Sequence, residues 1–254
     1  MHQPTLRVLR ILVLVAGNEK SLRLSDFSRE LNIPKSTLLP ILQTLCAERY
    51  LSQDDAGRYT PGNALFSISV GFSNSFPVLK YVHEQLSALV GILDETCYFG
   101  TLDNGSVLYL DKVDSTQPLR MLTSIGHRLP AYATGIGKSL LMDKTEAELS
   151  EIYPDGLSAL TDQTVKDIPS LYHQLTQARL EGYTWEIEES TKHVRCFAAP
   201  IRKHGNIVAA ISVTVPLFRY DPQSMPQLIR TLQTTAAQIG RTFEETNAHF
   251  GDSF

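Results

Sequence analysis

The sequence predicts an α+β protein of two domains. An N-terminal winged helix-turn-helix is joined by a linker helix to a larger α/β domain with an antiparallel sheet. Three observations support this fold class. The chain has 254 residues, enough for two domains of ordinary size. Three short segments of apolar periodicity and a strand pair occupy the first part of the chain. Beyond it, strand-like runs alternate with turns and helices, as in a sheet covered by helices.

The first two helices are predicted from apolar spacing and from end signals. Gly17 and Asn18 stop the first helix, and Ser25 is the predicted N-cap of the second, SDFSREL. Phe27 and Leu31 stand four residues apart and are predicted to face inward. The residues of the first helix predicted to form its apolar face are Leu6, Leu9, Val13 and Ala16.

The third helix is predicted from about Lys35 to Glu48, after a tight turn that ends at Pro34. Its predicted apolar face comprises Leu38, Ile41, Leu42 and Leu45. Pro40 lies inside this helix and removes the N–H that would bond the Ser36 carbonyl, at a cost of about 3 kcal/mol in a regular helix. A kink, a late helix start or water on the Ser36 carbonyl would reduce that cost.

The segment RYLSQDDAGRYTPG predicts a β-hairpin with its turn at DDAG, which completes a winged helix-turn-helix. In such a domain the second motif helix enters the major groove and the wing reaches phosphate or the minor groove. The candidate DNA-binding residues are Lys35, Ser36, Thr37 and Arg58. An ammonium and two hydroxyls at a helix N-terminus suit phosphate oxygens, as does a guanidinium on the wing. Protein-interaction modules also use three short helices and a hairpin, so this alternative stays open.

Charge and cysteine usage narrow the possible functions. Residues 1–50 hold seven Lys or Arg and four Asp or Glu, although the whole chain has a net charge of −4. This asymmetry fits a nucleic-acid module joined to an acidic domain. Cys46, Cys97 and Cys196 lie far apart and form no Cys/His cluster, so no disulfide framework, metal or cofactor is expected. No signal peptide or membrane span is predicted, and a cytoplasmic location is expected.

A linker helix is predicted where apolar residues recur at Leu65, Ile68, Phe72 and Phe76, and a second helix from about Val78 to Leu93. A helix between two domains has little of its own to pack against, so another subunit could cover it. The second domain is predicted to have hairpin turns at residues 103–105 and 204–206 and helices that begin near residue 135 and end at residue 182. A closing helix is predicted over residues 222–247, with the helices on one face of an antiparallel sheet.

The stretch LRVLRIL…LRLSDFSRELNIPKSTLLPILQTL…RYLSQDDAGRYTPG resembles the DNA-binding domain of the IclR family of bacterial transcription regulators. The stretches LRMLTSIGHRLPAYATGIGKSLL, EGYTWEIEES…VRCFAAPI and VAAISVTVP resemble its effector-binding domain, which has a GAF-like fold. The resemblance covers nearly the whole chain. It implies a DNA-binding domain over residues 1–62, a linker helix over 63–77 and an effector-binding domain over 78–254.

The resemblance also implies a homodimer, or a pair of dimers, that binds double-stranded operator DNA and a small carboxylate-containing effector. The chain departs from the family at Leu39, where an aromatic residue or His is common, and at Pro40, where Arg is common. The missing arginine removes a cation directed at the groove. We therefore expect DNA binding with altered sequence preference, and complete loss of binding is the alternative.

The resemblance places eight residues in the effector pocket: Met121, Leu129, Gly135, Ile136, Glu186, Cys196, Ser212 and Thr214. Ser212 and Thr214 alternate by two on one predicted strand and therefore face the same side. Gly135 opens a helix whose free N–H groups and dipole suit a carboxylate. An acidic Glu186 beside an anion site favours a hydroxylated or keto acid as the ligand. Each of these residues also has an ordinary alternative role in a strand, a turn or a core.

Three functions are compatible with these patterns. The leading hypothesis is a ligand-responsive transcription regulator, a repressor of a catabolic operon, with a small organic or sugar acid as effector. An enzyme that used Cys196 as nucleophile would need a lowered thiol pKa, whereas VRCFAAPI places the thiol in an apolar strand. No enzyme is therefore expected. A ligand sensor that acts through protein partners is the third hypothesis, and Pro40 is its support.

Overall fold

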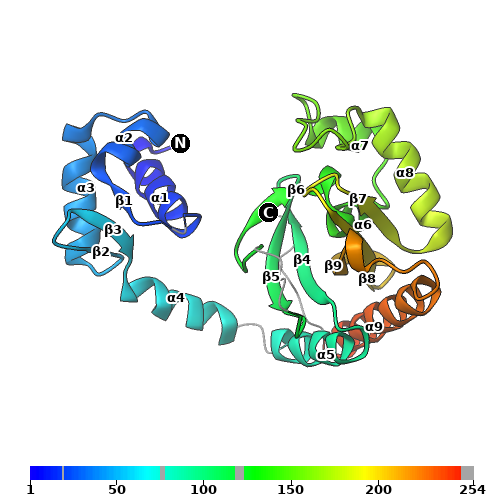
Figure 1. Ribbon diagram of the computed structural model, residues 1–254. Helices are drawn as coiled ribbons and strands as arrows, with labels where there is room; N and C mark the ends of the chain where they lie inside the picture. The colour runs from blue at the N-terminus through cyan, green and yellow to red at the C-terminus, as the bar shows by residue number, and fades with distance from the viewer. Residues whose placement is uncertain (19, 75–77, 118–122, 247–254) are drawn as a thin grey trace. The chain divides into compact units, whose positions relative to one another are not determined.

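The computed structural model describes residues 1–18, 20–74, 78–117 and 123–246. It divides into two compact units, Met1–Phe76 and Pro77–Phe254 (Figure 1). The first unit is helical with a small sheet, and the second contains a large antiparallel sheet with helices. None of the described helices is both long enough and apolar enough to span a bilayer.

The first unit is the predicted winged helix-turn-helix, followed by the helix α4. Its three-stranded antiparallel sheet has the strand order β1-β3-β2. One core joins the helices to the sheet, with Phe27 edge-on to Tyr59 at 5.7 Å between ring centroids. Its elements are α1 (Gln3–Ala16), β1 (Leu22–Arg23), α2 (Leu24–Leu31), α3 (Lys35–Ala47), β2 (Leu51–Gln53), β3 (Arg58–Pro61) and α4 (Asn63–Asn74).

Two details of the predicted helices are wrong. In α1 the buried residues are Ile11 and Val15, whereas Leu9 and Val13 of the predicted apolar face are exposed. The segment has two apolar stripes, and packing against the rest of the domain selects the other one. In α2 the N-cap residue is Arg23, two residues before Ser25, because the carboxylate of Asp26 accepts the Arg23 N–H at 2.8 Å.

The second unit contains a six-stranded antiparallel sheet of order β6-β5-β4-β9-β8-β7. Its strands are β4 (Thr96–Asp103), β5 (Ser106–Val113), β6 (Arg128–Pro130), β7 (Thr184–Ile187), β8 (Val194–Lys203) and β9 (Asn206–Pro216). Its α-helices are α5 (Val78–Leu93), α6 (Gly135–Leu141), α7 (Glu146–Ile152), α8 (Ile168–Glu181) and α9 (Met225–Glu245), with single 3-10 turns η1 (Ala131–Ala133) and η2 (Leu217–Arg219).

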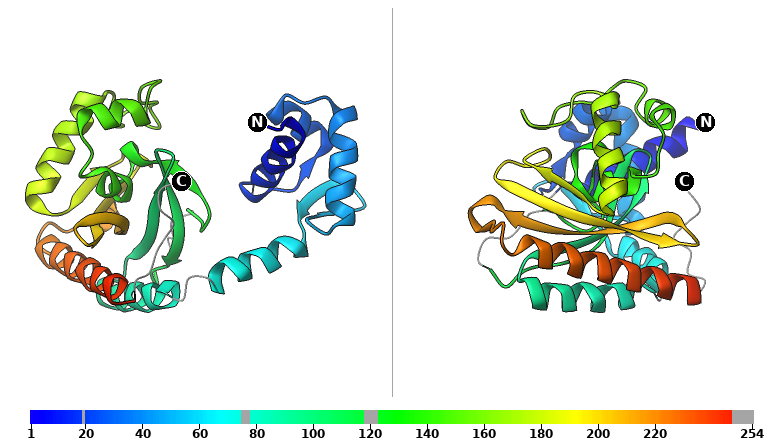
Figure 2. Two further views of the ribbon diagram at one scale, coloured as in Figure 1. Left: turned by 180° about the vertical axis from the view of Figure 1, so that it is seen from behind. Right: turned by 90° about the vertical axis from the view of Figure 1, so that its right-hand side faces the viewer.

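Helices cover both faces of this sheet, so the prediction of helices on one face is wrong. One core packs α5 and α9 against one face, and a second packs α6, α7 and α8 against the other (Figure 2). The physical reason lies in the central strands. β9 is buried from Ala209 to Pro216, so both its faces need an apolar cover.

The predicted hairpin turns are confirmed. Asn104 and Gly105 connect β4 to β5, and His204 and Gly205 connect β8 to β9, all four with positive φ. Two-residue turns of this kind match the twist of the strands that they join. Gly182, with φ 74°, ends α8 as predicted. The segment LRMLT, at the start of one of the stretches that resemble the effector-binding domain, falls largely on residues 118–122, which lie outside the described residues.

Two leucines of α8 test whether burial, rather than helix propensity, stabilises the second unit. Leu171 is 0% exposed and Leu180 is 81% exposed. Leu171→Ala should lower the free energy of unfolding by about 2–5 kcal/mol, because it leaves a cavity in the core. Leu180→Ala should change it by less than about 0.5 kcal/mol. Urea denaturation followed by fluorescence checks this, since the single tryptophan, Trp185, lies in β7 of the same unit.

Equal midpoints for Leu171→Ala and Leu180→Ala would contradict the packing of α8 on the sheet described above.

Candidate DNA-binding surface and effector cavity

The exposed face of α3 is the first candidate site. Lys35 and Ser36 are exposed in the first turn, whereas Thr37 is half-buried and its N–H bonds the Pro34 carbonyl at 3.0 Å. The buried face of the helix carries Leu38, Leu42 and Leu45, as predicted. Gln43 is exposed one turn beyond Leu39 on the same helix. It was not among the DNA-binding residues predicted from the sequence, although its spacing from Ser36 places it on the same face of the helix.

Pro40 is accommodated inside an uninterrupted α3 that begins at Lys35, as predicted, so a late helix start is not what reduces its cost. Leu39 and Pro40 both lie on the exposed side of the helix, as does Ser36, whose carbonyl lacks its usual N–H donor. The Thr44 hydroxyl donates to the Pro40 carbonyl at 2.9 Å. The outer surface of this helix therefore combines polar ends with an apolar centre.

The wing places Arg58 at the first residue of β3. The Asp54 carboxylate accepts the Arg58 N–H at 2.8 Å, and the Asp54 N–H donates to the Arg58 carbonyl at 3.0 Å. Gly57, with φ 71°, supplies the left-handed turn between them. The hydrogen bonds hold the Arg58 backbone and leave its exposed side chain out of the turn.

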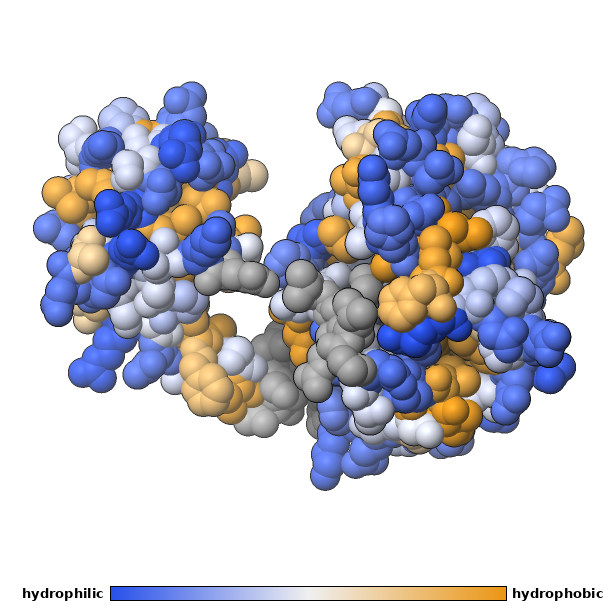
Figure 3. All heavy atoms as spheres, viewed as in Figure 1, coloured by the Kyte–Doolittle hydropathy of each residue, from blue (hydrophilic) through white to orange (hydrophobic). Residues whose placement is uncertain are grey.

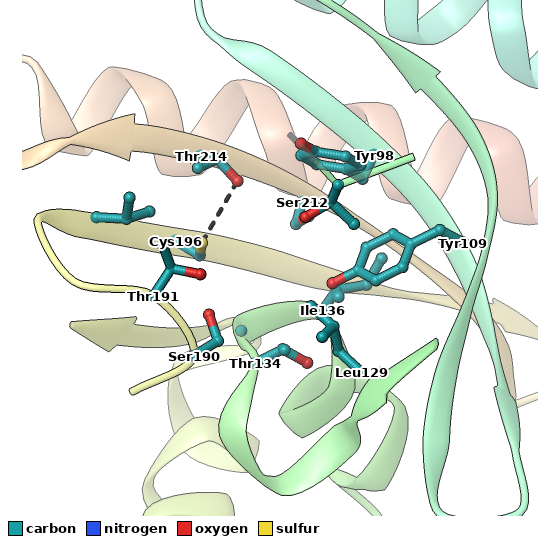
Figure 4. Close-up of a pocket in the computed structure, with 13 residues that line it drawn as sticks. Tyr98, Tyr109, Leu129, Thr134, Ile136, Ser190, Thr191, Cys196, Ser212 and Thr214 are labelled. Atoms are coloured by element: carbon teal, nitrogen blue, oxygen red, sulfur yellow. Dashed lines mark hydrogen bonds between the residues drawn. The ribbon is translucent and has the colours of Figure 1, made fainter. Parts of the chain in front are cut away.

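A cavity lies between the sheet and α6 in the second unit (Figure 4). Its volume is about 20 Å³, which corresponds to about one water molecule. Its walls come from β4, β5, β6, α6, β8, β9 and the segment between β7 and β8. The described residues that line it are Tyr98, Tyr109, Thr123, Leu129, Thr134, Gly135, Ile136, Ser190, Thr191, Val194, Cys196, Ser212 and Thr214.

The lining is rich in hydroxyl groups and, among the residues described above, contains no charged side chain. Its hydroxyls belong to two tyrosines, four threonines and two serines of the thirteen residues. Ser212 lies opposite Tyr98 in the β4–β9 register, and Thr214 faces the same side two residues further on. Each hydroxyl can both donate and accept a hydrogen bond. The cavity is therefore suited to a neutral or weakly acidic polar ligand.

The Tyr98 hydroxyl is buried and has no hydrogen-bond partner of normal geometry among the described residues, although the side chain of Thr123 lies near it. Burial raises the pKa of Tyr98 and of Tyr109, so both phenols stay protonated at neutral pH. An unsatisfied buried hydroxyl is costly unless a ligand or water bonds it. Neither tyrosine was identified from the sequence, because only the strand pairing brings them to the cavity.

Cys196 faces the cavity from β8, with its sulfur 3.4 Å from the Thr214 hydroxyl. Burial, followed by the nearby Glu186 carboxylate, raises the thiol pKa well above its ordinary value. A thiol that stays protonated is a poor nucleophile. In the described part of the chain, no cluster of three or more His, Cys, Asp or Glu side chains is suited to a metal ion.

Glu186 lies behind the cavity wall and is fully buried. Its carboxylate accepts the Glu189 N–H at 2.8 Å and the hydroxyl of Ser190, a lining residue, at 3.3 Å. Burial raises the pKa of Glu186. Lys138, in α6, forms a buried ion pair with Glu189 and does not line the cavity. Burial lowers the Lys138 pKa, and the Glu189 charge opposes that shift.

The two glycines at the start of α6 have packing roles. A Cβ on Gly137 would come within 2.3 Å of the Ala131 carbonyl oxygen, and one on Gly135 within 3.1 Å of the Cys196 Cβ. The Gly137 N–H is already bonded to the Thr134 hydroxyl at 3.1 Å. This N–H is therefore not one of the free donors expected at the helix start.

Six of the eight residues expected in the effector pocket line the cavity: Leu129, Gly135, Ile136, Cys196, Ser212 and Thr214. Glu186 lies one layer behind it, and Met121 lies outside the described residues. The cavity thus brings together residues that are widely separated in the sequence.

Both units match known protein families. Residues 5–55 match the IclR helix-turn-helix domain, and residues 72–241 match the C-terminal domain of the bacterial transcriptional regulator IclR. The HTH-type transcriptional regulator KdgR of Escherichia coli (strain K12) is 29% identical over 238 residues, which cover 92% of this chain and 90% of KdgR.

The HTH-type transcriptional repressor AllR of Escherichia coli (strain K12) is 32% identical over 236 residues, 92% of this chain and 87% of AllR. The crystal structure of an IclR homolog from Microbacterium hydrocarbonoxydans, complexed with 4-hydroxybenzoate, has the same fold. It superposes with a TM-score of 0.79 at 22% identity and covers 94% of this chain and 98% of that one.

The raised pKa of Cys196 predicts a slow reaction with iodoacetamide. Cys46 and Cys196 are both half-buried, but burial raises the pKa of Cys196 well above its ordinary value, whereas for Cys46 it causes a smaller rise. In the folded protein at pH 8, Cys196 should therefore react more than about tenfold slower than Cys46, because only the thiolate attacks. Mass spectrometry of the alkylated peptides checks this, with urea-unfolded protein as the control in which both thiols react. Rapid alkylation of native Cys196 would favour a nucleophilic role.

Proposed function

The chain belongs to the IclR family of bacterial transcriptional regulators and is a DNA-binding transcription regulator, and on that premise we propose that it is a repressor of a catabolic operon. Its proposed effector is a small organic or sugar acid that carries hydroxyl or keto groups. The observation that carries this proposal is the hydroxyl-lined cavity of the second unit. The proposed site of action is the cytoplasm, where both DNA and metabolites are present.

The proposed DNA contacts lie on α3 and the wing. Lys35, Ser36 and Thr37 at the start of α3 would bind phosphate oxygens, and Arg58 would bind phosphate or the minor groove. The exposed side chains of Leu39 and Gln43 would face base edges. Glutamine pairs with adenine, and apolar side chains contact the thymine methyl group. The proposed half-site is therefore rich in A·T pairs where α3 enters the groove.

The effector proposal follows from what the cavity offers. A buried carboxylate needs several hydrogen bonds if no cation faces it. Tyr98, Ser212 and Thr214 can donate these bonds, and further hydroxyls of the lining can bond the ligand's own hydroxyl or keto groups. The IclR homolog complexed with 4-hydroxybenzoate holds a hydroxylated carboxylate, although 22% identity supports only a common fold. KdgR and AllR, by contrast, are similar in sequence to this protein along most of its length and most of their own.

Effector binding would require a second, wider state of the cavity. A volume of about 20 Å³ is too small for an organic acid. A ligand that binds only the wider state shifts the population towards it. If the two states place the DNA-binding units of a dimer differently, acid binding would change operator affinity.

We also propose the domain boundaries 1–62, 63–77 and 78–254, and a homodimer that pairs partly through α4. Phe66, Ile68 and Val70 on this helix are 71%, 56% and 39% exposed. Figure 3 shows apolar surface over α4. An apolar helix in water is stabilised when a second copy covers it. Two dimers could pair further on the operator.

Lys35→Ala tests the DNA contacts. The substitution should weaken binding equally to the protein's own upstream DNA and to a scrambled duplex, since phosphate contacts carry no sequence information. The slope of log affinity against log salt should fall by about one unit per chain. Fluorescence anisotropy at several salt concentrations measures both quantities. Lys166→Ala, an exposed lysine of the second unit, is the matched control.

If Lys35→Ala left affinity and salt slope unchanged, α3 would not be the DNA-binding helix. If the folded wild-type dimer bound no DNA, with or without acids, the alternative of a sensor that acts through protein partners would be favoured.

Tyr98→Phe tests the cavity as the effector site. Thermal-shift screening of keto, hydroxy and sugar acids first identifies a ligand, and calorimetry then compares its affinity for the variants. Loss of the Tyr98 hydroxyl should weaken binding of the acid by about 1–3 kcal/mol, which is roughly a 5- to 150-fold loss of affinity. Tyr172→Phe removes a hydroxyl outside the cavity lining and should leave affinity unchanged. Equal affinities for both variants would place the ligand elsewhere.

A further inference from the structure

Two arginines face each other directly across the sheet of the winged domain. Arg23, the last residue of β1, pairs with Arg58, the first residue of β3, and the neighbouring pair is Leu22 with Tyr59. Leu22 and Tyr59 are buried, so strand alternation places both arginines on the outer face, where both are exposed. Directly opposite residues of an antiparallel pair have Cβ atoms about 4.5–5.5 Å apart.

This arrangement of like charges is unfavourable by itself. Among the described residues, neither guanidinium has an ion pair or a hydrogen bond. Two acidic residues that bond the backbone of these arginines are engaged with other atoms. Asp26 accepts the Arg23 backbone N–H at 2.8 Å and pairs with Arg29 at 3.2 Å. Asp54 accepts the Arg58 backbone N–H at 2.8 Å. Asp55, in the hairpin turn, is exposed, and its carboxylate forms no ion pair with the guanidinium of Arg23 or Arg58.

We propose that Arg23 and Arg58 together form a clamp for the DNA backbone, with Arg23 as a contact residue that the helix-turn-helix pattern does not indicate. The proposal rests on the proposed function, in which α3 and the wing bind operator DNA. A phosphate between the two guanidinium groups would remove their repulsion. Guanidinium binds phosphate oxygens through two parallel N–H donors, so two forks a strand spacing apart can hold one phosphate or two consecutive ones.

The clamp supplies affinity and position rather than sequence selection. Phosphate contacts fix the register of a protein on the duplex and are shared by all sequences. Arg23 also immediately precedes α2, so its contact would hold the helix-turn-helix at β1 while Arg58 holds the wing. The two contacts would be coupled, because a bound phosphate relieves the repulsion between the two guanidinium groups only when both arginines are present.

The test is a double-mutant cycle on Arg23 and Arg58, measured by fluorescence anisotropy at several salt concentrations. The duplexes are the protein's own upstream DNA and a scrambled duplex. Arg23→Ala should weaken binding to both duplexes by roughly tenfold or more and lower the salt slope by about 0.9 per chain. Arg23→Lys should keep the salt slope but bind more weakly, since the charge remains and the fork is lost. The effects of Arg23→Ala and Arg58→Ala should be non-additive.

Arg29→Ala is the matched control. It removes the same charge from an exposed arginine of α2, but that arginine is already paired with Asp26 and Glu30. Its affinity should stay within about twofold of wild type. The melting temperature of Arg23→Ala should not fall, because the substitution removes a repulsive pair. An unchanged melting temperature would show that the weaker DNA binding of Arg23→Ala is not caused by unfolding.

Wild-type affinity and salt slope in Arg23→Ala, alongside weaker binding by Lys35→Ala, would overturn the clamp and leave the proposed function intact. Strictly additive effects of Arg23→Ala and Arg58→Ala would overturn the coupling. Absence of DNA binding by the wild-type protein would overturn the proposed function and the clamp with it.

Discussion

The three central strands of the larger sheet, β4, β9 and β8, bury apolar side chains on both faces, and the second unit is built around this constraint. Phe99 and Ile211 pack towards α5 and α9, whereas Ala198 and Ala210 pack towards α6 and α8. Small residues on the second face let α6 approach closely. The ends of the same strands then carry polar residues on that face, and the cavity forms where the apolar packing ends.

The polar residues of the cavity conflict with their buried setting unless something bonds them. A buried hydroxyl such as that of Tyr98, which has no partner of normal geometry among the described residues, costs more unpaired than the hydrogen bond would contribute. The proposed ligand, with several polar groups, would resolve this conflict, and its binding free energy would then be available to shift the protein between two states. Behind the wall, Glu186 connects Ser190 to the segment held by the Lys138–Glu189 pair. This network fixes the cavity on one side.

Local features of the fold could be predicted from the sequence, whereas long-range ones could not. The turns at Asn104 and His204 follow from residue types that tolerate positive φ beside glycine. Family resemblance indicated six of the thirteen described residues that line the cavity. Tyr98 was missed because only the pairing of β4 with β9 brings it beside Ser212. The prediction of the buried face of α1 was wrong, because two apolar stripes compete in one helix. Only tertiary packing selects the stripe that contains Ile11.

The central claim is that acid binding in the cavity and operator binding by α3 and the wing are coupled. Coupling between two sites is reciprocal, so operator DNA must change acid affinity by the same factor by which the acid changes operator affinity. The most direct measurement is calorimetric titration of the acid into the full-length protein, with and without saturating operator DNA. The account predicts acid affinities that differ by roughly 5- to 150-fold between the two titrations. Equal acid affinities, in a protein that binds both ligands, would contradict it.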